Sequence, residues 1–164
     1  MTFFASDMHL AHERIINYTG RPYKNNEEMN ESLIKNWNEI VKPTDTIYHL
    51  GDFCFASNYK NWEARLNGKI IFFKGNHDKK RWLYSATIKF ADYRVYMTHV
   101  PPDNIPEGIS LVLCGHVHEK WKMKLWRDTQ IPMINVGVDV WNYHPVGIRT
   151  LLNELGKWKK EIVK

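Results

Sequence analysis

The sequence predicts an α/β fold with two β-sheets and flanking helices. Short apolar runs typical of buried strands recur along the first part of the chain, with helical segments between the early ones, and each run ends in a polar loop. After residue 118 the pattern changes to alternating segments that favour antiparallel strands of a second sheet. No linker rich in Pro, Gly or Ser interrupts the chain, so residues 1–164 are predicted to form a single domain.

The first elements follow from apolar content and spacing. Thr2–Ser6 is a short apolar strand, and Asn26–Val41 carries apolar side chains at helical spacing. Asn25 or Asn26 is the expected N-cap of that helix, and Pro43 ends it. The remaining elements expected before residue 75 are a strand at Thr46–Leu50, a helix that ends at Trp62–Leu66 before Gly68, and a strand at Lys69–Lys74.

The later elements are all read as strands. Tyr93–Thr98 and Leu111–Cys114 are short and mainly apolar. Trp121–Arg127, Ile131–Val138 and Val146–Leu152 alternate in polarity and are expected to complete the second sheet.

Five short polar segments stand at the ends of apolar runs. In open α/β sheets, ligands bind beyond the carboxyl ends of the strands, so these segments are expected to lie close together. Together they supply oxygen and nitrogen ligands for two metal ions, and their carboxylate, imidazole and amide groups suit Mn, Fe or Zn in an open hydrolytic site. The segments are Asp7-Met8-His9, Gly51-Asp52, Gly75-Asn76-His77-Asp78, His99 and Gly115-His116-Val117-His118.

In their order and spacing, these segments resemble the signature of the calcineurin-like metallophosphoesterases, and in particular of small single-domain members from bacteria and their viruses. The resemblance covers residues 5 to about 118 and implies two mixed sheets packed as a sandwich between helices. It also implies two divalent metal ions, with Mn as the expected metal and Fe, Zn or Ni as alternatives. One ion would be held by Asp7, His9, Asp52 and His118, and the other by Asp52, Asn76, His99 and His116.

The same resemblance implies a mechanism. A hydroxide that bridges the two ions would be the nucleophile, and His77 would protonate the leaving group as general acid. Asp78 would orient His77, and Asn76 would help to hold the phosphate oxygens. The implied activity is hydrolysis of a small or nucleotide-like phosphoester, with a diester favoured over a monoester.

Two alternatives remain beside this activity: a nuclease that acts on short or single-stranded nucleic acid, and a non-catalytic scaffold on the same fold. A phosphoprotein phosphatase is disfavoured, because the chain is short and no Arg follows Gly51-Asp52 closely. No ligand is missing, and this argues against the scaffold.

Three further residues are candidates for substrate contact. His12 follows His9 by three positions and could touch the substrate or cap a helix. Asn142 and His144 could line the pocket or form an ordinary turn before Pro145. His49, by contrast, is expected to be a hydrogen-bonded core residue inside a strand.

The formal net charge of +5 favours an anionic substrate and leaves nucleic acid open as a partner. Basic and aromatic residues occur together in three segments, which could form a platform for single-stranded nucleic acid or a solvated basic surface, the simpler interpretation. These are Lys79-Lys80-Arg81-Trp82, Trp121–Arg127 and Lys157-Trp158-Lys159-Lys160.

A cytoplasmic, non-membrane protein is expected. No apolar run approaches the ~20 residues of a membrane span, and no signal peptide is expected before Asp7. Cys54 and Cys114 are too few for a disulfide framework and are expected to be buried thiols.

Overall fold

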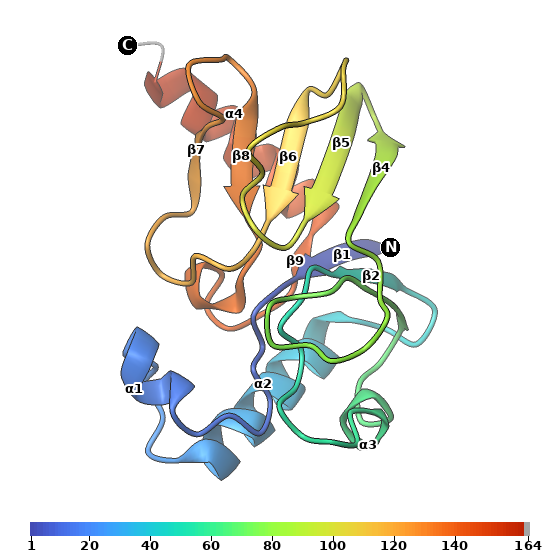
Figure 1. Ribbon diagram of the computed structural model, residues 1–164, viewed down its shortest axis with the longest axis vertical. Helices are drawn as coiled ribbons and strands as arrows, with labels where there is room; N and C mark the ends of the chain where they lie inside the picture. The colour runs from blue at the N-terminus through green and yellow to red at the C-terminus, as the bar shows by residue number, and fades with distance from the viewer. Residues whose placement is uncertain (163–164) are drawn as a thin grey trace.

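The first sheet gathers three parallel strands and one antiparallel neighbour. The computed structural model describes residues 1–162 and places β1 (Thr2–Ala5) beside β2 (Thr46–His49), which in turn pairs with β3 (Lys69–Phe72). On the other edge of β1, the short strand β9 (Val146–Gly147) runs antiparallel. The resulting order is β3-β2-β1-β9 (Figure 1).

The second sheet also has a parallel centre with antiparallel edges. Its central strands β5 (Tyr93–Thr98), β6 (Leu111–Cys114) and β8 (Pro132–Asn135) are parallel. The edge strands β4 (Ser85–Phe90) and β7 (Met123–Leu125) pair antiparallel with β5 and β8. Both sheets are therefore mixed, and the predicted fold class is confirmed.

Helices connect and cover the sheets. The longest pair are α2, whose N-cap Asn25 accepts a hydrogen bond from the backbone of Glu28, and α4 at the end of the described chain. The expected cap of α2 is thus confirmed, and the helix ends just before Pro43, which cannot continue it. The helices are α1 (Ile15–Thr19), α2 (Asn26–Ile40), α3 (Lys60–Glu63), the 3-10 helix η1 (Val138–Val140) and α4 (Ile148–Ile162).

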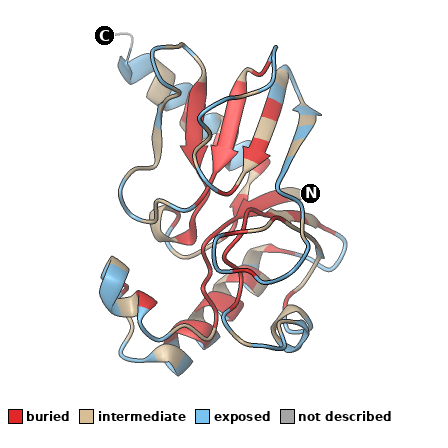
Figure 2. Cartoon of the chain, in the orientation of Figure 1, coloured by how far each residue is buried: buried red, intermediate tan, exposed pale blue. Residues whose placement is uncertain are grey.

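Alternation along the strands separates two main apolar cores. On β1, Phe3 and Ala5 pack with α2, whereas Phe4 packs with residues of the second sheet. The α2 side of the first core includes the fully buried Trp37. Because successive side chains of a strand point to opposite faces, one short strand serves both cores. Figure 2 shows this buried interior along β6, β8 and β1.

One expectation about the elements is wrong, and some elements were not expected. Val146–Leu152 is not one strand of the second sheet: β9 stops at Gly147 and joins the first sheet, and α4 begins at Ile148. Ile148, Leu151 and Leu155 are buried at helical spacing, so burial of this face favours the helix. The strand β4 and the helix α1 were not expected from the sequence.

The helices of residues 1–162 are too short or too polar to cross a bilayer. Both cysteines are buried and unpaired, as expected from the sequence.

Candidate dinuclear metal centre

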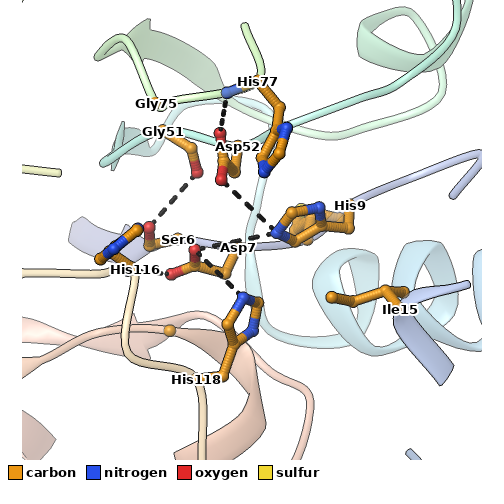
Figure 3. Close-up of polar contacts among 12 residues, drawn as sticks. Ser6, Asp7, His9, Ile15, Gly51, Asp52, Gly75, His77, His116 and His118 are labelled. Carbon is orange, nitrogen blue, oxygen red and sulfur yellow. Dashed lines mark hydrogen bonds and ion pairs between the residues drawn. The ribbon is translucent and has the colours of Figure 1, made fainter. Parts of the chain in front are cut away.

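The predicted ligands meet because each follows the carboxyl end of a strand. Asp7 and His9 follow β1, and Asp52 follows β2. From the second sheet, His99 follows β5, and both His116 and His118 follow β6. Figure 3 shows side chains from these loops pointing toward one another, with Asp7 between His9, His116 and His118.

Three buried polar atoms at this junction have no hydrogen-bond partner among residues 1–162: Oδ1 of Asp7, Nε2 of His9 and Nε2 of His99. Asp7 and His9 are at most 1% exposed, and His99 is 2% exposed. A buried polar atom left unpaired is destabilising by about 1–3 kcal/mol, so a native site needs a reason to keep three. Bound cations between these side chains would satisfy them.

The distances fit cation ligands better than hydrogen bonds. His9 Nε2 lies 3.9 Å from Asp7 Oδ1 and 3.6 Å from Asp52 Oδ2. His99 Nε2 is 3.4 Å from Asp52 Oδ2, and His118 Nε2 is 4.0 Å from Asp7 Oδ1. Two donors that each lie ~2.0–2.2 Å from one metal ion are at most about 4.4 Å apart, so these spacings leave room for an ion between them.

Two groups of ligand atoms are close enough to share an ion each. One contains Asp7, His9 and His118, and the other contains Asp7, Asp52 and His99. Asp7 thus joins both groups, whereas the resemblance assigned only Asp52 to both ions.

The remaining two predicted ligands, Asn76 and His116, lie at the exposed rim. The ring of His116 is 5.3 Å from that of His99, and its backbone N–H donates to Asp7 Oδ2 at 2.8 Å. Asn76 lines a shallow hollow that His99 also lines.

Five of the seven predicted ligands have a left-handed backbone. A residue other than Gly is uncommon there and stores about 1–3 kcal/mol of strain, which clusters at functional sites. The φ angles are 57° for Asp7, 51° for His9, 54° for Asp52, 71° for His116 and 47° for His118.

Two glycines permit the close approach of the ligand loops. A Cβ atom on Gly115 would lie 2.0 Å from Ser6 Oγ, and one on Gly75 would lie 2.1 Å from Asp52 Oδ1. Any larger residue would push a ligand loop away from β1 or β2.

A buried ion pair between Arg21 and Asp139 contacts two of the loops that carry predicted ligands. Arg21 Nε donates to Asp139 Oδ1 at 2.8 Å, and Arg21 Nη2 donates to Asp139 Oδ2 at 3.0 Å. The same Oδ2 also lies 3.0 Å from His118 Nδ1. Arg21 also donates to the backbone oxygens of Asp7 and Met8 at 2.7 and 3.0 Å. This one arginine therefore fixes the loop after β1 to the carboxylate that orients His118.

Sequence reasoning missed both Arg21 and Asp139. The two residues are separated by 118 positions and stand in no recognisable motif, so only the fold brings them together. A signal was present in the sequence, since Asp139 is an acidic residue within the apolar run that follows β8.

The pKa values of two buried histidines of the site shift in opposite directions. Burial lowers the pKa of His9 to about 2, although Asp52 opposes this, so the ring is neutral with a lone pair to give. For His99, burial also disfavours the charged form, but the carboxylates of Asp52 and Asp7 outweigh it and raise the pKa to about 9. A cation at Asp52 would displace that proton, because metal ligands bind in deprotonated form.

The sequence also matches a known family over most of its length. A family model described as a calcineurin-like phosphoesterase superfamily domain matches residues 2–146. The chain belongs to this superfamily. An uncharacterized protein of Methanocaldococcus jannaschii, MJ1445, is 35% identical to it over 164 residues, which span 96% of this chain and 92% of that protein.

Two solved structures have a similar fold. A protein of unknown function from Aquifex aeolicus, AQ665, has a TM-score of 0.75 and 29% identity, with 94% of this chain and 98% of that chain covered. A novel archaeal phosphodiesterase shares the fold, with a TM-score of 0.51 and 19% identity over 83% of this chain and 82% of that chain.

In this member of the calcineurin-like phosphoesterase superfamily, a hollow of about 540 Å³ opens over the predicted ligands His9, Asp52, His116 and His118. The exposed side chain of His77 lines it, and its backbone N–H donates to Asp52 Oδ1 at 2.9 Å (Figure 3). The predicted general acid is thus at the mouth of the ligand cluster.

His12 also lines this hollow. Its ring stacks on Phe55 with centroids 3.7 Å apart, and its Nδ1 lies 3.3 Å from His9 Nδ1. The helix-capping alternative is not observed, because Arg14 is the N-cap of α1.

Asp78 differs from expectation. Its two carboxylate oxygens accept the backbone N–H groups of Asp52 at 2.7 Å, Gly75 at 2.8 Å and Phe53 at 3.3 Å. The carboxylate therefore holds the loops after β2 and β3 together, and this is a different task from orienting the His77 ring.

Three other histidine and amide predictions need correction. Asn142 and His144 line a separate hollow with Pro145 and Val146, because the turn after η1 points toward the end of α2, where His144 Nε2 is 3.9 Å from Glu39. His49 is buried in β2 as expected, yet neither ring nitrogen has a hydrogen-bond partner within the described residues. Burial lowers its pKa to about 3 and keeps it neutral.

Proposed function

We propose that this chain is a metal-dependent phosphodiesterase with two divalent cations at the junction of its sheets. The observation that carries the proposal is the set of buried, unpartnered donor atoms on Asp7, His9 and His99. Membership of the calcineurin-like phosphoesterase superfamily supports the reaction class.

The residues present fit two cations. Following the resemblance, one would be held by Asp7, His9, Asp52 and His118, and the other by Asp52, Asn76, His99 and His116. Asp7, which belongs to both groups of close donor atoms, would also face the second cation. When bound, the cations would withdraw electron density from the phosphoryl oxygens and lower the pKa of water. We propose Mn²⁺, because the donors are carboxylates, imidazoles and an amide without thiolate.

The chain's own residues divide the remaining work. A water oxygen loses a proton to solvent and forms a bond to phosphorus while the bond from phosphorus to the leaving oxygen breaks, and the products are a phosphomonoester and an alcohol. His77 donates the proton that the leaving oxygen needs, an effect typically worth ~10²–10⁴ in rate. Its exposure at the mouth of the hollow lets the ring reach that oxygen.

The test is hydrolysis of bis-p-nitrophenyl phosphate and p-nitrophenyl phosphate by metal-stripped protein, before and after addition of Mn²⁺. We expect turnover only with the metal, and faster turnover of the diester. Asp52→Asn should lower kcat/KM by at least about a hundredfold. Loss of a residue that only hydrogen-bonds to a metal ligand already costs about 10–100-fold, and this variant removes a predicted ligand itself.

Full activity of the Asp52→Asn variant would contradict the proposal. A preference for the monoester would replace it with a phosphatase. Calorimetric binding of Mn²⁺ without turnover of either ester would instead favour the non-catalytic scaffold.

A further inference from the structure

A second hollow of about 410 Å³ adjoins the first on the far side of His77. Phe55 and His77 line both hollows, so the two side chains separate them without closing either. None of the predicted metal ligands lines the second hollow, whereas His9, Asp52, His116 and His118 line the first. With metal ions at the predicted ligands, a scissile phosphate would lie in the first hollow, and a group beyond His77 would be the leaving group.

The second hollow has the chemistry of a site for an anion with a planar ring. Lys79 and Lys80 line it, both are exposed, and no Asp or Glu is among its lining residues within the described chain. Neither lysine takes part in an ion pair among residues 1–162. Two ammonium groups without a carboxylate partner favour the binding of a phosphate.

Its aromatic wall is held in place by packing. The ring of Trp82 stacks on Phe72 with centroids 4.5 Å apart and meets Tyr59 edge-on at 5.1 Å. Lys80 Nζ lies 5.5 Å from the centre of the Tyr59 ring. A nucleobase that enters this hollow would find rigid rings beside it, and each base–aromatic stack is typically worth ~1–3 kcal/mol.

The Trp121–Arg127 segment also brings lysines over aromatic rings, with Lys122 Nζ 3.8 Å from the centre of the Trp141 ring, but the hollows that Lys122 lines contain Glu154 as well. Lys157 on α4 pairs with Glu154 at 2.7 Å, and the hollow beside it also contains Glu161. Arg127 pairs with the exposed Asp103 at 3.0 Å. The second hollow differs from those segments because no carboxylate lines it within the described chain and because it shares Phe55 and His77 with the first hollow.

We propose that the second hollow is a leaving-group subsite for a nucleotide that carries a phosphate of its own. The preferred substrate is then an oligonucleotide-type phosphodiester, with its scissile phosphate over the metal ligands and its next phosphate between Lys79 and Lys80. This inference rests on the proposed phosphodiesterase function and adds the substrate class.

Three dinucleotides test it with the Mn²⁺-loaded protein. The compounds are dTpdT, the same dinucleotide with a 5′-phosphate, and the same dinucleotide with a 3′-phosphate, so the added charge lies on opposite sides of the scissile ester. Wild-type protein should cleave one of the phosphate-bearing compounds at the internal ester about tenfold better than dTpdT in kcat/KM, because one end alone can enter the second hollow.

The variant Lys79→Ala/Lys80→Ala should lose most of this preference, measured as the ratio of the two kcat/KM values. The matched control is Lys69→Ala/Lys89→Ala, which removes the same charge from exposed lysines on β3 and β4 that line neither hollow. The control should keep the wild-type ratio.

Equal ratios in the two double variants, or no preference in wild-type protein that turns over bis-p-nitrophenyl phosphate, would overturn the subsite alone. Failure of wild-type protein to hydrolyse any diester would overturn the phosphodiesterase proposal and this inference with it.

Discussion

Single side chains behind the predicted ligands decide how firmly those ligands are placed. Asp139, whose side chain is 2% exposed, contacts both His118 and Arg21. Burial alone would raise the pKa of Asp139, but its hydrogen bonds with His118 and Arg21 lower it to about 2. The carboxylate is thus ionised and accepts from the His118 ring, which leaves the other ring nitrogen facing Asp7.

Asp139→Asn is expected to weaken Mn²⁺ binding about 10–100-fold, since loss of a hydrogen-bond partner behind a metal-binding histidine has effects of that size. A calorimetric titration of metal-stripped protein measures it. The control is Asp103→Asn, which removes a carboxylate that is 96% exposed. A lower Tm with unchanged affinity would show that Asp139 acts only on stability.

The candidate site was predictable where residues stand next to strands, and it was not predictable where the contacts are tertiary. Asp7, His9 and Asp52 could be found because polar residues follow apolar runs, and the carboxyl ends of parallel strands share an edge. Arg21 and the actual contacts of Asp78 depend on loops that fold against one another, and no local pattern encodes that. The catalytic and metal-binding roles of these residues stay predictions.

At the scale of elements, the strands with apolar runs were found, and β5 and β6 have the predicted bounds, whereas the boundaries of the elements after residue 118 were not predicted. The edge strand β4 alternates between exposed and half-buried residues, so its pattern resembles a surface loop. At β9 the chain pairs with β1 for two residues and then turns directly into α4. Because Val146–Leu152 contains both periods, an alternating strand was the wrong interpretation.

Substitution by alanine should raise the stability of the fold at Gly156 and lower it at Gly115. Gly156 lies exposed within α4, and nothing is within 4 Å of its added Cβ, so Gly156→Ala should stabilise the fold by about 0.5–1 kcal/mol. Gly115→Ala places its Cβ against Ser6 Oγ and should lower both stability and metal affinity. Thermal denaturation followed by circular dichroism measures both changes.

A Gly156→Ala variant that melts below the wild type would contradict this account of α4. Gly115→Ala with wild-type metal affinity would contradict the close packing of the loops after β1 and β6.

At the scale of the molecule, the candidate metal centre joins the two sheets. Asp7 and Asp52 come from the first sheet, and His99 and His118 come from the second. Bound cations would link the two halves of the fold through buried atoms that are otherwise unpaired. Metal binding should therefore be visible as stability of the whole chain.

Addition of Mn²⁺ to metal-stripped protein is expected to raise Tm by about 5 °C or more at a hundredfold excess over Kd, since that excess stabilises the folded state by ≈2.7 kcal/mol. Differential scanning calorimetry measures the shift. Asp52→Asn should lose most of it, and an equal shift in that variant would place the stabilising ion elsewhere.

Selection for stability and selection for activity should favour different residues at the five predicted ligands with a left-handed backbone, which are Asp7, His9, Asp52, His116 and His118. Glycine at any of these positions would relieve strain and, at the buried ones, remove a side chain whose polar atoms need a cation. Directed evolution for heat resistance alone, without metal, would therefore accept glycine at these positions and discard activity. A library selected for turnover would keep the strained residues and gain its stability from distant positions such as Gly156.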